Sequence, residues 1–143
     1  MSRELLHATA VAINGNGVLL SGPSGSGKSD LALRLIDRGA ILISDDGVLV
    51  DSDGPLIMLR TAPNIAGMIE MRGVGIIKMS FADGVPLRLA VALDKSAERL
   101  PPEGLTKKIA GCDVAYLAQS AFEVSAALKI EQALRIALES QGA

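Results

Sequence analysis

The fold is decided by the stretch Gly22-Pro23-Ser24-Gly25-Ser26-Gly27-Lys28-Ser29, which matches the pattern G-x-x-x-x-G-K-[ST] at every fixed position. Residues 17–21 are predicted to form a short strand before it, and residues 29–38 a helix after it. In such an arrangement the glycines let successive backbone N–H groups, and the positive end of the helix, face one phosphate chain. Lys28 is expected to reach the outer phosphates, and the Ser29 hydroxyl to bind Mg²⁺. The register with a strand and a helix disfavours a chance turn rich in glycine and serine.

Composition predicts one compact domain, residues 1–143, with an aliphatic core: 49% of the residues are hydrophobic, but there is no Trp, one Tyr and two Phe. A net charge of −2 and few aromatic side chains for base stacking argue against nucleic-acid binding. The single cysteine, Cys112, excludes an internal disulfide and a thiolate zinc site. Residues 1–20 do not resemble a signal peptide, and no run of about 18 apolar residues predicts a membrane span. We therefore expect a cytoplasmic protein.

A hairpin is predicted just before the glycine-rich stretch. Residues 5–13 are rich in β-branched and aliphatic residues, which is typical of a strand. The following Asn14-Gly15-Asn16-Gly17 favours a tight turn, because Asn and Gly tolerate positive φ. The strand that enters the glycine-rich stretch should therefore pair antiparallel with the strand before it. This predicts an α/β fold with a mixed sheet, largely antiparallel at its edges.

The middle of the chain is predicted to be mostly β-structure. Strand patterns end at Ser44 and resume at Gly47, and residues 42–59 together resemble a second hairpin. Residues 61–67 are expected to be a loop or a short helical turn. Residues 68–79 predict an interrupted strand, because two glycines and two charged residues interrupt its apolar pattern.

The C-terminal part is harder to interpret. Residues 87–93 predict a further strand. Residues 98–113 contain prolines, glycines and the pair Lys107-Lys108, and are expected to form a loop or lid. Residues 128–138 predict a helix capped by Ser125, with Glu131 and Arg135 as an i, i+4 ion pair.

Two adjacent acids, Asp45 and Asp46, follow an apolar strand pattern. An acid at the end of a buried strand is the usual metal-side partner of a phosphate-binding loop. Adjacent residues of an extended chain point to opposite sides, so one acid can serve Mg²⁺ indirectly while the other accepts a proton from an attacking hydroxyl. Asp94 also follows an apolar strand pattern, but an ordinary turn follows it, so the doublet is preferred.

Glu70 and Arg72 have the chemistry of a metal ligand and of a stabiliser of phosphoryl charge. Two residues apart on an extended chain, they would face the same way. A solvated pair on an edge strand is an equal alternative. His7, the only histidine, would by itself be read as a structural or surface residue.

Several segments together resemble the HPr kinase/phosphorylase family. They are His7-Ala8-Thr9-Ala10-Val11, the stretch 22–29, the doublet Asp45-Asp46 and Ile69-Glu70-Met71-Arg72-Gly73-Val74-Gly75-Ile76-Ile77. The last motif is far more specific than the phosphate-binding pattern. The resemblance runs in order over about residues 5 to 100 and more weakly beyond.

The resemblance implies an ATP- and Mg²⁺-dependent enzyme that phosphorylates a serine of an HPr-like phosphocarrier protein and reverses this with inorganic phosphate. It implies a phosphate-loop domain with a mixed sheet, similar to phosphoenolpyruvate carboxykinase. It assigns Lys28 to the phosphates and Ser29 and Glu70 to Mg²⁺. Asp46 would be the general base, or the general acid in reverse, and Asp45 would support it. His7 would lie in the active site, and Arg99 would match a family arginine, although its spacing differs.

This chain also departs from the family pattern. It has no room for the additional N-terminal domain of longer members, so it resembles a short form with the catalytic domain alone. The glycine-arginine-asparagine segment tied to dephosphorylation is not visible, which leaves the reverse reaction open, and a homo-oligomer remains an option. Two rivals stay open: a small-molecule kinase on the same loop, and a nucleotide-sensing module without catalysis. A GTPase is disfavoured, because no Asn-Lys-x-Asp motif is present.

Overall fold

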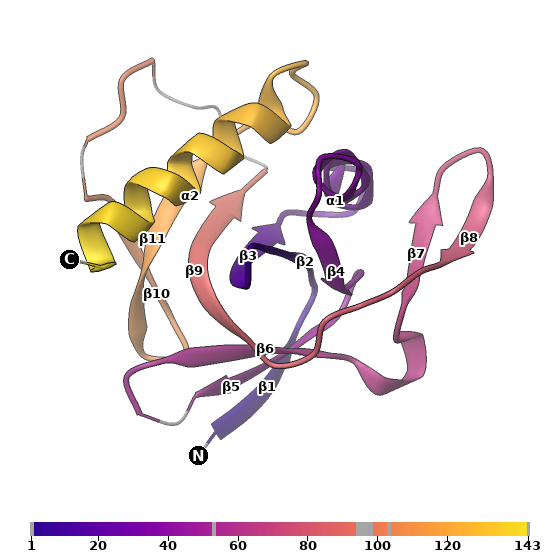
Figure 1. Ribbon diagram of the computed structural model, residues 1–143, viewed down its shortest axis with the longest axis horizontal. Coiled ribbons are helices and arrows are strands. Elements are labelled where there is room, and N and C mark those ends of the chain that lie inside the picture. The colour runs from indigo at the N-terminus through magenta and orange to yellow at the C-terminus, as the bar shows by residue number, and fades with distance from the viewer. Residues whose placement is uncertain (1, 53, 94–98, 103, 143) are drawn as a thin grey trace.

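The strand before the glycine-rich loop, β3 (Asn16–Ser21), lies inside a mixed sheet. The computed structural model describes residues 2–52, 54–93, 99–102 and 104–142, and within these the sheet has nine strands (Figure 1). The other strands are β1 (Ser2–Leu6), β2 (Ala8–Ile13), β4 (Ile41–Ser44), β5 (Val48–Ser52), β6 (Ile57–Thr61), β9 (Val85–Ala92), β10 (Thr106–Ile109) and β11 (Cys112–Ala118). Among the strand pairs that the structure describes, β3–β9 and β9–β11 are parallel and the others antiparallel, which confirms the predicted mixed sheet.

The first hairpin forms as predicted. β2 pairs antiparallel with β3 from Ala8 opposite Ser21 to Ile13 opposite Asn16, and Asn14 adopts a positive φ of 51° in the turn. The predicted single strand 5–13 is wrong, however, because it is two strands separated at His7. β1 leaves the hairpin there and pairs with β5 instead. The break lets one segment serve two parts of the sheet.

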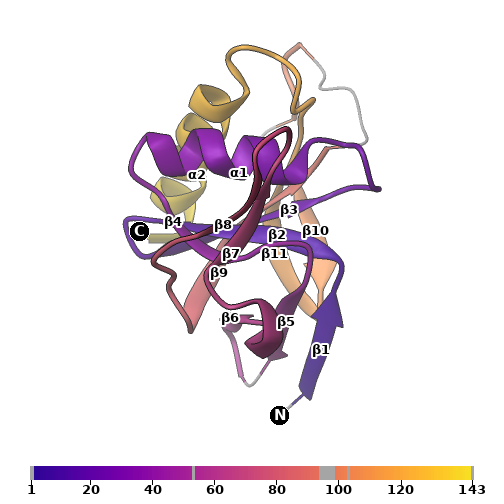
Figure 2. The same cartoon turned by 90° about the vertical axis from the view of Figure 1, so that its right-hand side faces the viewer.

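The central strands are buried on both faces. α1 (Lys28–Asp37) and α2 (Ala126–Gly142) lie together on one side, and β1, β5 and β6 lie on the other (Figure 2). Alternate residues supply the two cores: in β3, Val18 and Leu20 face the helices, whereas Leu19 packs with the β5–β6 side. This explains why these strands are continuous apolar runs. None of the described helices is both long and apolar enough to cross a membrane.

The second hairpin lies further along the chain than residues 42–59. It consists of β5 and β6, in register from Val48 opposite Thr61 to Ser52 opposite Ile57. β4 is not part of it, since β4 pairs with β2. The chain turns between β4 and β5 at Asp46, whose φ is 58°, so the acid doublet forms a corner rather than the middle of a hairpin strand. The short helical turn expected next is the 3₁₀ helix η1 (Pro63–Ile65).

Residues 68–79 form a separate hairpin of β7 (Met68–Met71) and β8 (Gly75–Lys78), which projects from the body (Figure 1). The expected interruption is the turn between the two strands. Arg72 lies in that turn while Glu70 lies on β7. The prediction that these two side chains share one face of an extended chain is therefore wrong.

The C-terminal region departs most from expectation. The second half of the supposed lid at 98–113 forms the β10–β11 hairpin, and β11 then extends the sheet parallel to β9; residues 98 and 103 lie outside the described residues. The last helix, α2, begins near the predicted cap Ser125 but is longer than predicted. The predicted Glu131–Arg135 pair is wrong: Glu131 binds Arg38, the residue after α1, at 2.8 Å, and Arg135 binds Glu139 at 3.3 Å.

An ion cluster around the buried Asp51 joins β1, β5 and β6. Asp51 accepts from Arg3 Nε at 2.5 Å and from Arg60 Nε at 2.9 Å, and it is only 7% exposed. The hydrogen bond from Arg3, followed by that from Arg60, lowers the pKa of Asp51 from 3.8 to about 2. Protonation of Asp51 should therefore weaken the attachment of β1 in acid.

Replacing Asp51 with asparagine should lower the free energy of unfolding at neutral pH. It should also make that free energy change less as the pH falls. A depressed carboxyl pKa contributes stability above the unfolded-state value, and that contribution disappears as pH falls from about 4 to about 2. Urea unfolding at a series of pH values measures this. Asp113→Asn, at an exposed pair with Lys108, is the control and should leave the acid slope unchanged. An Asp51→Asn slope equal to that of the wild type would contradict the assignment.

Candidate active site

Several of the predicted site residues lie at one edge of the sheet. Because β2 runs antiparallel to both β3 and β4, the latter two point the same way, as do β9 and β11. Their carboxyl ends therefore lie together, next to the start of β2. Ser21 of β3 lies opposite both Ala8 and Ala92 in the register. In open α/β sheets such an edge is where ligands bind.

Asp45 joins three separate elements at this edge. Its Oδ1 accepts from Ser29 Oγ at 2.7 Å and from Thr9 Oγ1 at 2.9 Å. Its Oδ2 accepts from the backbone N–H of Glu70 at 3.2 Å. The carboxylate is 7% exposed, so these bonds replace water. One buried acid thus connects α1, β2 and β7, and brings the Ser29 hydroxyl and the backbone of Glu70 together.

Asp46 has the opposite environment. Its side chain is exposed, and its backbone N–H donates to Thr9 Oγ1 at 3.2 Å. Asp45 thus faces inward and Asp46 outward, but they do so at a corner of the chain and not along the extended strand on which the prediction rested. The exposed carboxylate is free to meet a group that arrives from solvent, whereas Asp45 is engaged within the protein.

Thr9 was missed by sequence reasoning. It is fully buried on β2 and bridges both acids, donating to the carboxylate of Asp45 and accepting from the N–H of Asp46. Its signal was a hydroxyl within the otherwise apolar run Ala8-Thr9-Ala10-Val11. A buried hydroxyl requires a partner, and here that partner is the acid doublet.

Lys28 lies across the loop that precedes it. Its Nζ donates to the carbonyl oxygens of Gly22 at 2.8 Å and Pro23 at 3.1 Å. The Ser26 hydroxyl is buried and has no hydrogen-bond partner within the described part of the chain. A Cβ at Gly22 would lie 2.6 Å from that hydroxyl, so the loop is tightly closed at its start. The loop thus carries this unpaired hydroxyl, and an amine that donates to carbonyl oxygens of the loop itself.

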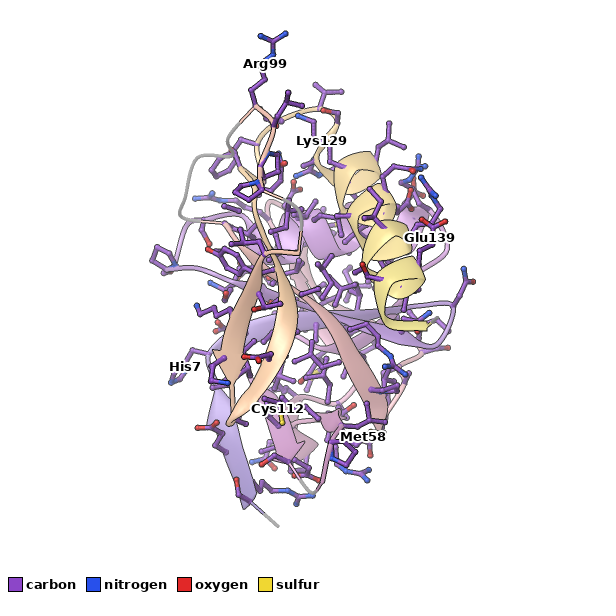
Figure 3. All side chains as sticks on the ribbon, turned by 90° about the vertical axis from the view of Figure 1, so that its left-hand side faces the viewer. His7, Met58, Arg99, Cys112, Lys129 and Glu139 are labelled. Atoms are coloured by element: carbon purple, nitrogen blue, oxygen red, sulfur yellow. The ribbon has the colours of Figure 1, made fainter. Side chains whose placement is uncertain are left out.

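The remaining predicted residues occupy different places. Glu70 is exposed on β7, with its backbone held by Asp45. His7 is exposed at the edge that holds the loop, because it precedes Ala8, the register partner of Ser21 (Figure 3). Arg99 is exposed and extends outward from its loop, away from Asp45 and its hydrogen-bond partners (Figure 3). Asp94 lies outside the described residues.

The described residues include no group of three or more His, Cys, Asp and Glu side chains suited to hold a metal ion. The candidate Mg²⁺ ligands are instead one hydroxyl, Ser29, and one carboxylate, Glu70. Mg²⁺ is often held by one or two carboxylates together with substrate phosphates.

Gly27 should tolerate alanine less well than Gly25. Both have a positive φ near 90°, which costs any residue with a Cβ about 1–2 kcal/mol. Only at Gly27 would that Cβ also meet other atoms, at 2.9 Å from Ala121 Cβ, whereas none lies within 4 Å at Gly25. Gly27→Ala should therefore lose a further 1–3 kcal/mol or so of unfolding free energy through overpacking. Urea unfolding of both variants measures the difference, and equal losses would contradict the contact.

Comparison with known proteins identifies the family of this chain. The family model described as HPr Serine kinase C-terminal domain matches residues 1–119. The chain belongs to this family. The solved structure of the Hpr(Ser) kinase/phosphatase from Coxiella burnetii superimposes with a TM-score of 0.82 at 25% sequence identity, covering 98% of this chain and 99% of that one.

Curated relatives named HPr kinase/phosphorylase are also similar. The relative from Limosilactobacillus reuteri is 37% identical over 151 aligned residues, which cover 96% of this chain and 45% of the relative. The relative from Clostridium botulinum is 49% identical over 77 residues, which cover 52% of this chain and 25% of the relative. The chain thus spans less than half the length of these relatives, and it shares with them the HPr serine kinase C-terminal domain.

Proposed function

We propose that this chain is a protein-serine kinase that transfers a phosphoryl group from Mg·ATP to a serine of an HPr-like phosphocarrier protein in the cytoplasm. The observation that carries this is the convergence of Ser29, Asp45 and Glu70 beside the glycine-rich loop. Membership of the family and the names of its relatives supply the acceptor.

The chemistry of the loop fits a nucleotide phosphate chain. We infer that residues 22–29 act as a phosphate-binding loop in a domain similar to phosphoenolpyruvate carboxykinase. The buried Ser26 hydroxyl lacks a protein partner, and Lys28 Nζ binds only carbonyl oxygens of its own loop. Both groups would gain from exchanging these surroundings for phosphate oxygens.

Ser29 and Glu70 would hold Mg²⁺, whose charge would be shared with the phosphate oxygens. Asp45 acts on the cation indirectly. Because it accepts the hydrogen bond from the Ser29 hydroxyl, the oxygen lone pairs of Ser29 stay available to a cation. It also fixes the backbone of Glu70 at the same place. These contacts determine where the two ligands lie before nucleotide arrives.

Asp46 would act on the acceptor. Its exposed carboxylate accepts the proton of the seryl hydroxyl while that oxygen bonds to the γ-phosphorus and the bond to the β-phosphate oxygen breaks. Lys28 neutralises charge on the transferring group. In the reverse direction the bond between the serine oxygen and phosphorus would break, an oxygen of inorganic phosphate would bond to that phosphorus to give pyrophosphate, and protonated Asp46 would return the proton to serine; the relatives' names favour this second activity.

Mass spectrometry of a purified HPr-like carrier, incubated with this protein and Mg·ATP, tests the proposal. We expect the carrier to gain one phosphoryl group, and a carrier whose acceptor serine is replaced by alanine to gain none. A metabolite pool with labelled ATP serves as the parallel arm. Labelling of a metabolite alone would favour a small-molecule kinase, and binding of ATP without turnover of any acceptor would favour a sensing module.

A further inference from the structure

A large aromatic side chain is exposed beside the glycine-rich loop. Phe122 is one of two phenylalanines in a chain without tryptophan, and it is 73% exposed in the loop between β11 and α2. Aromatic rings of this size are ordinarily buried, where they contribute most to stability. The other phenylalanine, Phe81, is 45% exposed, so what distinguishes Phe122 is its place beside the glycine-rich loop.

The segment carrying Phe122 is fixed against the loop. A Cβ on Gly27 would lie 2.9 Å from Ala121 Cβ and 3.3 Å from the Phe122 ring, so only a glycine permits this approach. Arg34 of α1 donates to the carbonyl oxygen of Ala121 and, at 3.1 Å, to that of Glu123. The ring is therefore positioned by backbone contacts on both sides.

The side of the loop that Phe122 occupies identifies its ligand. The sheet order along this edge is β11-β9-β3-β2-β4, with the loop following β3 in the middle. Asp45 and Asp46 follow β4 on one side, where phosphoryl transfer and the acceptor belong. Phe122 follows β11 on the other side, where its segment lies against Gly27, just before α1, and contacts Arg34 of α1. A nucleotide with its outer phosphates toward Asp46 has its base toward Phe122.

We propose that Phe122 is the platform on which the nucleobase of the bound nucleotide stacks, an inference that rests on the proposed function. Stacking is tolerant of base identity, because every base presents a π-face. Phe122 should therefore contribute to affinity for ATP and GTP alike, with little discrimination between them.

Titration calorimetry with Phe122→Ala tests this. ATP should bind about 5- to 100-fold more weakly, the loss expected for one stacked base, whereas inorganic tripolyphosphate should bind as it does to the wild type. Val124→Ala, in the same segment and fully exposed, is the matched control and should change neither affinity. Equal losses for ATP and tripolyphosphate would assign the ring a structural role and overturn the proposal. An unchanged ATP affinity with weaker binding of the carrier would assign it to the acceptor instead.

Fluorescence supplies a second readout. Since the chain has no tryptophan, Phe122→Trp introduces a single reporter, which ATP and ADP should quench and tripolyphosphate should not. Phe81→Trp, on the β4 side near Gly67, is the control and should not respond. Quenching absent in Phe122→Trp, while calorimetry shows ATP bound, would overturn this inference alone. A wild-type protein that binds no ATP would overturn the proposed function and this inference with it.

Discussion

Asp46→Asn is expected to slow phosphoryl transfer to the carrier by roughly 10²- to 10⁴-fold, the usual contribution of a general base, while ATP affinity changes little. The amide keeps the size and shape of the carboxylate but cannot accept the seryl proton. Asparagine also tolerates the left-handed backbone at this position, where φ is 58°, so the corner between β4 and β5 should be preserved. Single-turnover kinetics with saturating Mg·ATP measure the rate.

The control for this variant is Asp37→Asn, which neutralises another exposed acid near the end of α1. It should leave the rate unchanged, which separates loss of a base from loss of surface charge. The melting temperature of Asp46→Asn should stay close to that of the wild type, because the Asp46 contact to Thr9 uses only the backbone N–H. Transfer at the wild-type rate in Asp46→Asn would remove Asp46 from its role.

Local signals in the sequence were sufficient for the central part of the fold. The Asn-Gly turns predicted the β2–β3 hairpin, and the family and its mixed sheet were recognised from motifs at Gly22–Ser29 and Ile69–Ile77. These predictions succeed because each depends on residues close in the chain, where turn chemistry and spacing determine the geometry. The roles of the site residues stay predictions that the experiments above test.

Long-range partners could not be predicted in the same way. Nothing near His7 indicates that β1 leaves its neighbour to pair with β5, and the apolar pattern of β11 does not show that it joins β9. Glu131 binds Arg38, which is distant in sequence, rather than Arg135 one turn away, because the packing of α2 on α1 offers a partner that an isolated helix lacks. The same limit hid Thr9, whose partners follow another strand.

The largest expected loss of stability is at Asp45. Asp45→Ala removes the acceptor of three hydrogen bonds and leaves the hydroxyls of Thr9 and Ser29 and the N–H of Glu70 without it. Unsatisfied buried polar groups cost about 1–3 kcal/mol each, and Ser29 and Glu70 can recover part of this from water. We expect the free energy of unfolding to fall by about 2–4 kcal/mol in urea titrations without nucleotide.

A double-mutant cycle with Thr9→Val separates this network from a simple loss of volume. Valine matches the shape of threonine but has no hydroxyl. In that background Asp45→Ala leaves one polar group fewer without a partner, so it should lower the free energy of unfolding by less. A coupling energy of about 0.5–3 kcal/mol is expected between two residues in direct contact. Additive losses would show that the hydroxyl of Thr9 does not support Asp45. Asp45 would then be held by its bonds to Ser29 and to the backbone of Glu70 without help from Thr9.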